Sequence, residues 1–251
     1  MTNHDHGVPV ALVTGASSGI GAAIARKLAT QGYRLAICAR RRDRLAALQQ
    51  ELTANGAEVL SQAADLRQEA DILAVFAAIR QQWGGVDVLI NNAGLGHKSP
   101  LMSGETKAWR EMLDVNVLAL CICTREAVKD IQQRGDRGHI VHISSLSGHR
   151  VPGASGVYAA SKFAVRALTE ALRQELRAAN SAIRVSSVSP GFAETEFAEK
   201  YHRDPAKAAA IYSQFPVLQA ADVANAVVYV LSQPDYVQVQ DVLMRSTFQQ
   251  S

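Results

Sequence analysis

The sequence predicts an α/β protein: a single-domain, doubly wound parallel sheet (Rossmann fold) with helices on both faces. Short β-branched or apolar runs alternate along the chain with longer stretches of helical periodicity. Parallel strands joined by right-handed crossovers place helices on both faces of such a sheet. The 251 residues are 48% hydrophobic and 20% charged, which is the balance of a globular chain and excludes intrinsic disorder.

The first half of the chain contains four expected strands, each followed by an expected helix. Residues 10–14 form a β-branched run that stops at Gly15, and residues 86–90 form an apolar run that suits a strand buried on both faces. Apolar residues recur at helical spacing within 21–31 and 69–82. The strands are expected at 10–14, 34–39, 58–63 and 86–90, and the helices at 21–31, 41–52, 69–82 and 108–130.

The second half continues the alternation and ends on a strand. The expected strands are 139–143, 183–188 and 238–244, and the expected helices are 157–179 and 221–231. Residues 192–216 lack clear periodicity, so we expect a flap over the substrate or a helical insertion there. Residues 8–251 are therefore expected to form one catalytic domain, preceded by a disordered polar tail over 1–7.

Composition excludes several classes of partner. The net charge of +3 comes from scattered residues, which does not favour nucleic acid or an anionic membrane, and no apolar run reaches the ~18 residues of a membrane span. Three cysteines cannot form a disulfide framework, so a reducing, cytoplasmic location is expected. Cys121 and Cys123 would point about 200° apart on a helix. They cannot share a metal ion, and no metal site is expected.

A glycine-rich loop follows the first expected strand. Residues 14–21 read Thr-Gly-Ala-Ser-Ser-Gly-Ile-Gly, with a helix after them. Glycine permits the tight turn at Gly15, the approach of a pyrophosphate near Gly19, and close helix–strand packing at Gly21. The start of the helix then offers free N–H groups to phosphates, although a glycine-rich turn without a ligand would have the same spacing. The candidate contacts are Gly15, Ser17, Ser18, Gly19, Ile20 and Gly21.

The residues after the second expected strand carry a signal for the kind of cofactor. Many dinucleotide sites place a carboxylate here to bind the ribose 2′-hydroxyl. This chain has Ala39, Arg40 and Arg41 instead, with no acid before Asp43. Because a guanidinium binds a 2′-phosphate and a carboxylate repels it, the sequence predicts NADP(H), bound mainly by Arg40 with help from Arg41. A solvated basic helix start is the alternative.

A tyrosine and a lysine four residues apart begin the helix expected at 157–179. Tyr158 and Lys162 share a helix face, and Ser145 follows the strand expected at 139–143, at the sheet edge where α/β proteins bind ligands. We expect the Lys162 cation, together with an oxidised nicotinamide, to lower the pKa of Tyr158. Tyr158 could then transfer a proton to or from a carbonyl oxygen that Ser145 binds.

Together these motifs resemble the classical short-chain dehydrogenases/reductases over about residues 8–232. The resemblance rests on the glycine loop 14–21, Asp65-Leu66, Asn91-Asn92-Ala93-Gly94, Asn116-Val117, Ser145, Tyr158 to Lys162, and Pro190-Gly191 with Thr195.

The resemblance implies a role for each of these positions. Tyr158 would be the acid/base, Ser145 the partner of the substrate oxygen, and Lys162 both a ribose ligand and a modulator of the Tyr158 pKa. Asn116 would hold the water of a proton relay to Lys162. The remaining implied cofactor contacts are Asp65 and Leu66 at the adenine, Asn92, Ala93 and Gly94 along the cofactor, and Pro190, Gly191 and Thr195 at the nicotinamide.

The C-terminus departs from the commonest pattern of that family. Residues 241–248 lack the glycine-rich strand motif of many members and look more like NADP-linked carbonyl reductases, 3-hydroxy acid dehydrogenases and keto-steroid dehydrogenase/reductases. The expected function is interconversion of a carbonyl and an alcohol with NADP(H), by a homodimer or homotetramer. A 3-hydroxy acid dehydrogenase, a non-catalytic NADP(H)-binding sensor or scaffold, and an isomerase of the same fold are the alternatives.

Overall fold

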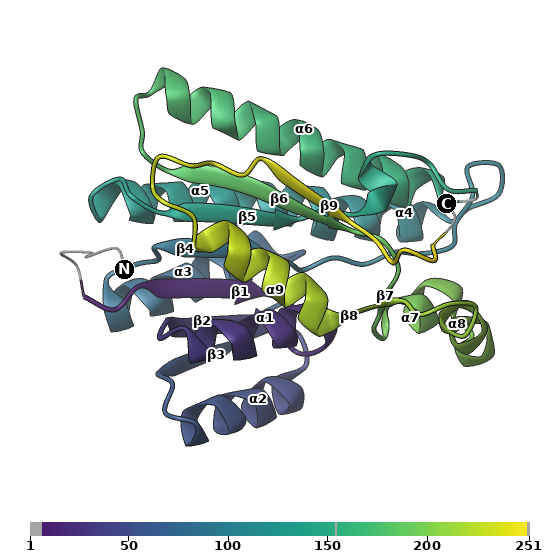
Figure 1. The fold of residues 1–251 in the computed structure, drawn as a ribbon, viewed down its shortest axis with the longest axis horizontal. Coiled ribbons are helices and arrows are strands. Elements are labelled where there is room, and N and C mark those ends of the chain that lie inside the picture. The colour runs from purple at the N-terminus through teal and green to yellow at the C-terminus, as the bar shows by residue number, and fades with distance from the viewer. Residues whose placement is uncertain (1–6, 154, 250–251) are drawn as a thin grey trace.

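A computed structural model describes residues 7–153 and 155–249 (Figure 1). The tail expected at 1–7 lies outside the described residues apart from Gly7, which is exposed. The described residues form a parallel sheet of seven strands in the order β3-β2-β1-β4-β5-β6-β9, flanked by helices. The strands of this sheet are β1 (Val10–Thr14), β2 (Arg34–Ala39), β3 (Val59–Ala63), β4 (Val88–Asn91), β5 (His139–Ile143), β6 (Arg184–Pro190) and β9 (Asp241–Met244).

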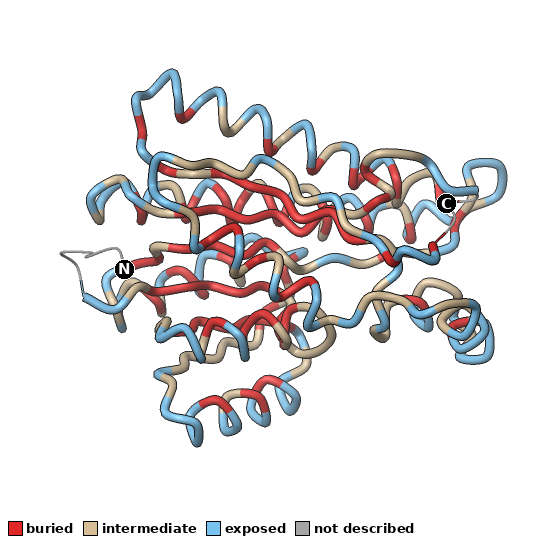
Figure 2. Tube along the Cα trace, in the orientation of Figure 1, coloured by how far each residue is buried: buried red, intermediate tan, exposed pale blue. Residues whose placement is uncertain are grey.

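Strand side chains alternate between two hydrophobic clusters. In β1, Ala11 and Val13 belong to the cluster under helices α1, α2 and α9, while Val10 and Leu12 belong to the cluster under α3, α5 and α6. The sheet is thus covered on both faces, and the buried core follows its central strands (Figure 2). The covering helices are α1 (Gly19–Thr30), α2 (Arg42–Ala54), α3 (Glu69–Trp83), α5 (Ala119–Gln133), α6 (Gly156–Ala178) and α9 (Ala220–Leu231).

The long helix expected over 108–130 is present as continuous helix over 106–133, but it contains a π-helical turn that the sequence did not predict. The structure has α4 (Thr106–Leu113), a π-helical turn (Asp114–Leu118) and then α5. The wider turn contains Asn116, whose side chain makes hydrogen bonds to the backbone of Leu95 instead of facing solvent. Single π turns of this kind are frequent at functional sites.

The segment without periodicity proves to be a helical insertion. It contains β7 (Ala193–Glu194), α7 (Phe197–His202), α8 (Pro205–Tyr212) and β8 (Leu218–Gln219), and β7 pairs with β8 in parallel. Figure 1 places α7 and α8 beyond the carboxyl ends of the sheet strands. No helix in the described ranges is both long and apolar enough to span a bilayer.

Candidate active site

A cavity of about 840 Å³ opens at the carboxyl ends of β1, β4, β5 and β6. This is where an open α/β sheet binds its ligands. Every candidate cofactor contact from the sequence lies on its wall, together with Ser145. These residues are Gly15, Ser17, Ser18, Gly19, Ile20, Gly21, Arg40, Arg41, Asp65, Leu66, Asn92, Ala93, Gly94, Tyr158, Lys162, Pro190, Gly191 and Thr195.

The glycine loop has the geometry that a phosphate requires. Gly15 has a φ of +69°, and a Cβ there would lie 2.8 Å from the Cα of Ala93. A Cβ on Gly21 would lie 2.6 Å from the carbonyl oxygen of Gly15, so a side chain would push α1 away from the loop. Ser18 precedes α1 without capping it through its side chain. The first amides of α1 are therefore left for an anionic ligand, and the loop fits a dinucleotide.

Thr14 holds the loop against the end of β4, a role that the sequence analysis missed. Its hydroxyl oxygen accepts hydrogen bonds from the backbone amides of Asn92 and Ala93, both at 3.0 Å. The side-chain amide of Asn92 donates back to the carbonyl oxygen of Thr14 at 2.8 Å. These bonds join the end of β1 to the end of β4 and so fix the cofactor side of the cavity. No local sequence pattern around Thr14 predicts them.

The two candidate phosphate ligands lie in different environments. Arg40 is exposed on the cavity wall, and the described residues give it no hydrogen bond or ion pair. Arg41 donates to the hydroxyl of Ser17 from Nε at 3.1 Å and to the carboxylate of Glu196 from Nη1 at 2.7 Å. Nearby, the Arg67 guanidinium bonded to Asp65 lowers the pKa of that carboxyl, so Asp65 is charged at neutral pH.

Ser145 lies just beyond the end of β5, half-buried on the cavity wall. Its Oγ accepts a hydrogen bond from the amide of Ser147 at 3.1 Å and so caps a short 3₁₀ turn, Leu146–Gly148. Its hydroxyl also donates a long hydrogen bond of 3.5 Å to the carbonyl oxygen of Pro190, an acceptor that a substrate oxygen could replace.

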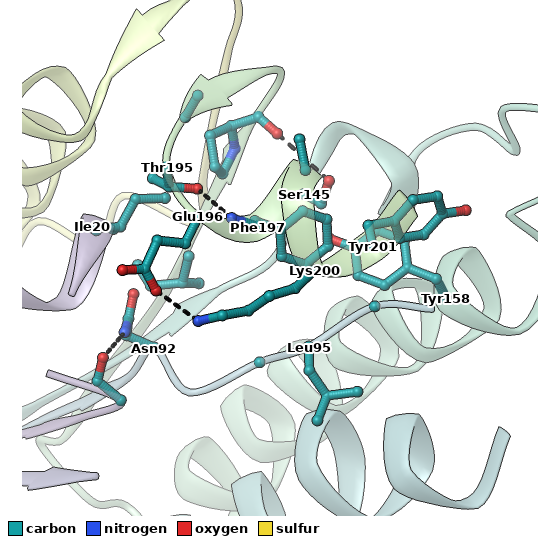
Figure 3. Close-up of a pocket in the computed structure, with 18 of the residues that line it drawn as sticks. Ile20, Asn92, Leu95, Ser145, Tyr158, Thr195, Glu196, Phe197, Lys200 and Tyr201 are labelled. Atoms are coloured by element: carbon teal, nitrogen blue, oxygen red, sulfur yellow. Dashed lines mark hydrogen bonds and ion pairs between the residues drawn. The ribbon is translucent and has the colours of Figure 1, made fainter. Parts of the chain in front are cut away.

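Tyr158 lies in the first turn of α6, with its ring beside the substrate side of the cavity (Figure 3). Burial raises the pKa of its phenol to about 12, and a hydrogen bond from Ser145 offsets this only in part. Among the chain's own groups, desolvation of the phenolate exceeds the favourable contact with Ser145. The lowering expected from Lys162 together with an oxidised nicotinamide stays a prediction. At neutral pH the phenol is a proton donor.

Lys162 is buried one helical turn further along, with 6% of its surface exposed. Its ammonium donates to the carbonyl oxygen of Ile143 at 2.9 Å. Burial lowers the pKa of this lysine to about 8. A Cβ on Gly94 would lie 3.5 Å from the ammonium, so the glycine leaves the approach to it open from the cofactor side.

Asn116 is the predicted catalytic residue that does not line the cavity. Its Oδ1 accepts from the amide of Leu95 at 2.8 Å, and its Nδ2 donates to the carbonyl of Leu95 at 2.8 Å and to the hydroxyl of Ser161 at 3.0 Å. The side chain therefore ties the segment after β4 to α6, the helix of Tyr158 and Lys162. A relay role for Asn116 stays a prediction.

Aromatic rings form the substrate side of the cavity. The ring centroid of Phe197 lies 5.3 Å from that of Tyr158 and 5.9 Å from that of Tyr201 (Figure 3). Among nearby basic residues that could pair with a substrate carboxylate, Arg150 and Lys200 line the cavity, whereas Arg203 and Lys207 do not.

Gln249 shows how the C-terminal segment closes this side of the cavity. Gln249, 6% exposed, accepts a hydrogen bond from the amide of Phe192 at 3.0 Å, so the C-terminal segment returns to the cavity wall. The sequence analysis missed it, because a glutamine near the chain end carries no signal. His149 lies outside the cavity lining, with Nε2 3.0 Å from a carboxylate oxygen of Asp241. Within the described ranges, no group of three His, Cys, Asp or Glu side chains could hold a metal ion.

Comparison with known proteins establishes the family. The family model for short chain dehydrogenases matches residues 9–206. The chain belongs to the short-chain dehydrogenases. It is 51% identical over 246 residues to dehydrogenase/reductase SDR family member 11 of Bos taurus, covering 96% of both chains. It is 41% identical over 241 residues to farnesol dehydrogenase of Aedes aegypti, covering 94% of this chain and 95% of that one. As a member of this family the chain is an oxidoreductase that acts on CH–OH groups with a nicotinamide cofactor.

Solved structures agree on the fold. The closed form of a serine dehydrogenase complexed with NADP⁺ superposes with a TM-score of 0.91 at 32% identity, covering 96% of both chains. A short chain dehydrogenase/reductase from Burkholderia phymatum in complex with NAD superposes with a TM-score of 0.86 at 28% identity, covering 96% of this chain and 90% of that one. Similar structures thus hold nicotinamide cofactors with and without the 2′-phosphate.

Proposed function

We propose that this short-chain dehydrogenase interconverts a ketone or aldehyde and its alcohol with NADP(H). The observation that carries the proposal is the meeting of Ser145, Tyr158 and Lys162 on the wall of the cavity that the glycine loop and Arg40 also line. A site with a positioned proton donor, a hydroxyl for the substrate oxygen and a dinucleotide loop is suited to moving a hydride and a proton between two partners.

The residues divide the chemistry as follows. The nicotinamide, when bound, supplies or accepts the hydride at its C4 position. Ser145 holds the substrate oxygen by a hydrogen bond and stabilises negative charge on it. Tyr158, protonated at neutral pH because burial raises its pKa to about 12, delivers its phenolic proton to that oxygen. Lys162 holds a positive charge behind the phenol and is placed to bind a ribose hydroxyl.

The cofactor would lie along the wall from Arg40 to Thr195. We infer that the glycine loop binds its pyrophosphate, Asp65 and Leu66 flank its adenine, and Arg40 binds its 2′-phosphate. NADP(H) is favoured over NAD(H) because Arg40 is exposed and free of an ion pair in the described structure, and because Ala39 supplies no carboxylate.

For the substrate we favour an apolar or bulky carbonyl compound. Phe197 and Tyr201 place aromatic surface directly beside Tyr158, and one relative acts on farnesol, an apolar alcohol, according to its name. A 3-hydroxy acid is the second candidate, supported by Arg150 and Lys200 on the cavity wall and by the likeness to a serine dehydrogenase. Kinetics with a panel of terpenoid and steroid ketones against 3-oxo acids distinguishes the two.

A non-catalytic NADP(H)-binding sensor or scaffold is the alternative of another class. Such a protein has no need to keep Ser145, Tyr158 and Lys162 together on one wall, which disfavours it. Titration of the purified protein with NADPH and the carbonyl panel distinguishes an enzyme from a sensor or scaffold. Only an enzyme oxidises NADPH, and the absorbance of NADPH then falls. We also infer a homodimer or homotetramer, and a cytoplasmic location stays a prediction of the sequence.

The cofactor preference is tested by replacing Arg40. A charge-assisted hydrogen bond contributes roughly 1.5–3 kcal/mol, so Arg40→Ala should lower kcat/KM for NADPH by roughly 10- to 150-fold. The same change should barely alter kcat/KM for NADH, which lacks the phosphate. Ala39→Asp should go further, because it repels NADPH and offers NADH an acceptor for its hydroxyl.

Arg42→Ala is the matched control, since Arg42 is exposed at the start of α2 and does not line the cavity. It should leave the ratio of NADPH to NADH activity unchanged. A parent enzyme that prefers NADH, or an Arg40→Ala variant that weakens both cofactors equally, would show that the arginine run is a solvated helix start.

A further inference from the structure

The carboxylate of Glu196 lies at the centre of three cations. Its Oε2 is 2.7 Å from Nη1 of Arg41 and 2.6 Å from Nζ of Lys200, and its Oε1 pairs with Arg44. These contacts lower the pKa of the carboxyl, so it is charged at every ordinary pH. The proposed roles of the catalytic residues leave this cluster unexplained.

The cluster joins the substrate side of the cavity to the cofactor side. Glu196 immediately precedes α7 in the helical insertion, and Figure 3 shows it and Lys200 lying across the cavity near Ile20 and Asn92. Arg41 immediately precedes α2, and the described ion pairs and hydrogen bonds between the insertion and α2 all end on Glu196.

The donors of Arg41 are almost fully used. Its Nε and Nη2 donate to the hydroxyl of Ser17 at 3.1 and 3.0 Å, and Nη2 also donates to Ser18. Its Nη1 donates to Glu196. A guanidinium has five N–H groups in a fixed plane. A dianionic phosphate that binds Arg41 must therefore compete with Glu196 for the N–H groups of Nη1.

We propose that Glu196 is an internal counter-anion that competes with the 2′-phosphate of NADP(H) for Arg41 and so sets cofactor selectivity. The inference rests on the proposed use of NADP(H) at this site. When the phosphate binds, Arg41 exchanges one anion for the other, and Arg44 is left as the only described ion-pair partner of Glu196 in α2. The link between the helical insertion and α2 is thereby weakened. A cofactor without the 2′-phosphate leaves both the Arg41 and the Arg44 contacts of Glu196 in place.

The energetics allow the exchange to be reversible. Glu196 and Arg41 keep 31% and 35% of their side-chain surfaces exposed. Ion pairs at such exposure change an equilibrium by about one- to fivefold each. A phosphate carries close to twice the charge of a carboxylate at neutral pH and presents three acceptor oxygens. Glu196 therefore keeps the insertion paired with Arg41 until the phosphate arrives, at a modest cost to NADP(H) affinity.

The test uses two fragments of the cofactor that fill only its adenosine half. Adenosine 2′,5′-bisphosphate carries the 2′-phosphate, and adenosine 5′-monophosphate lacks it. Calorimetry measures both dissociation constants for the parent, Glu196→Gln and Glu199→Gln. Glu199 is the matched control, because it is exposed on the same helix, does not line the cavity and has no ion pair in the described structure.

Removing the competing carboxylate should strengthen binding of the bisphosphate but not of the monophosphate. Glu196→Gln should bind the bisphosphate about three- to tenfold more tightly. The phosphate then no longer has to break one or two half-exposed ion pairs of Glu196, and it no longer meets the negative charge of that carboxylate. Its affinity for the monophosphate should change less than about twofold. Glu199→Gln should match the parent with both fragments.

Amide hydrogen exchange across 197–212 gives a readout that does not depend on affinity. In the parent, the bisphosphate should accelerate exchange in this segment and the monophosphate should not. In Glu196→Gln, exchange should already be fast and should no longer respond to the bisphosphate.

The outcomes separate this inference from the proposed function. If the parent binds both fragments equally, the proposed use of NADP(H) is wrong, and so is the proposed competition between Glu196 and the 2′-phosphate. A parent that prefers the bisphosphate, with Glu196→Gln indistinguishable from Glu199→Gln, would overturn the competition alone. Protection of 197–212 by the bisphosphate in the parent would also contradict it.

Discussion

The protonation state of Tyr158 is set by burial. The phenol lies among protein groups that disfavour its charged form, which raises its pKa to about 12. A phenol that keeps its proton suits an acid that protonates a newly formed alkoxide. We therefore expect the chain's own residues to favour carbonyl reduction at neutral pH, and oxidation to become faster as pH rises.

Tyr158→Phe tests this role directly. The substitution removes the proton donor and leaves the ring, so turnover should fall by at least ~10²- to 10⁴-fold, the usual contribution of general acid catalysis. NADPH binding, followed by its fluorescence, should stay near the parent value because the other contacts remain. Tyr229→Phe, on the exposed face of α9, is the control and should keep full activity. Turnover within a few-fold of the parent would remove Tyr158 from the mechanism.

At the scale of single residues, sequence could indicate only those that sit in a local pattern. Tyr158 and Lys162 are four apart on one helix, and the glycines of the loop lie within a few residues of each other, so spacing alone predicts them. Thr14 and Glu196 act through partners 78 and 155 residues away. Nothing near them in the sequence indicates such contacts.

Elements were predictable where one periodicity governs the whole segment. Residues 10–14, 34–39 and 139–143 are strands as expected, because both of their faces are buried and their pattern is unambiguous. The helix expected at 108–130 is present, but its periodicity did not predict the π turn at Asp114–Leu118, where Asn116 bonds to Leu95 of another segment. Helical periodicity cannot report a wider turn whose side-chain partner lies in a distant segment.

We expect the oligomer contact to lie on helices α4 to α6. Leu113, Leu118 and Phe163 are large apolar residues with 46%, 54% and 40% of their surfaces exposed. We expect them to be covered in a homodimer or homotetramer, so light scattering at micromolar concentration should report a mass of at least two chains. Leu118→Arg should shift the mass toward a monomer, whereas Leu73→Arg, exposed on α3, should not. A monomeric parent would refute the contact.

Across the whole molecule, the strand order assembles the site. β1 and β4 are central neighbours from which the chain winds in opposite directions, so the glycine loop after β1 faces the segments after β4, β5 and β6. Sequence predicted the parallel sheet and therefore the edge at which these segments meet. It could not predict that the helical insertion and the C-terminal segment both return to that edge, because their contacts depend on the finished fold.

The finished sheet also buries two histidines whose protonation should make the whole fold acid-sensitive. Burial lowers the pKa of His139 and of His142 to about 3, from 6.5. Between those pH values the unfolded chain binds more protons than the folded one, so stability falls as pH falls. From pH 7.5 to pH 5 each histidine should lower the free energy of unfolding by about 2 kcal/mol. Carboxylates with lowered pKa values, such as Glu126 at about 2, lose their contribution mainly below this range. Urea unfolding at the two pH values measures the loss, and His142→Gln should show about half of it. Equal losses in parent and variant would place the titrating group elsewhere.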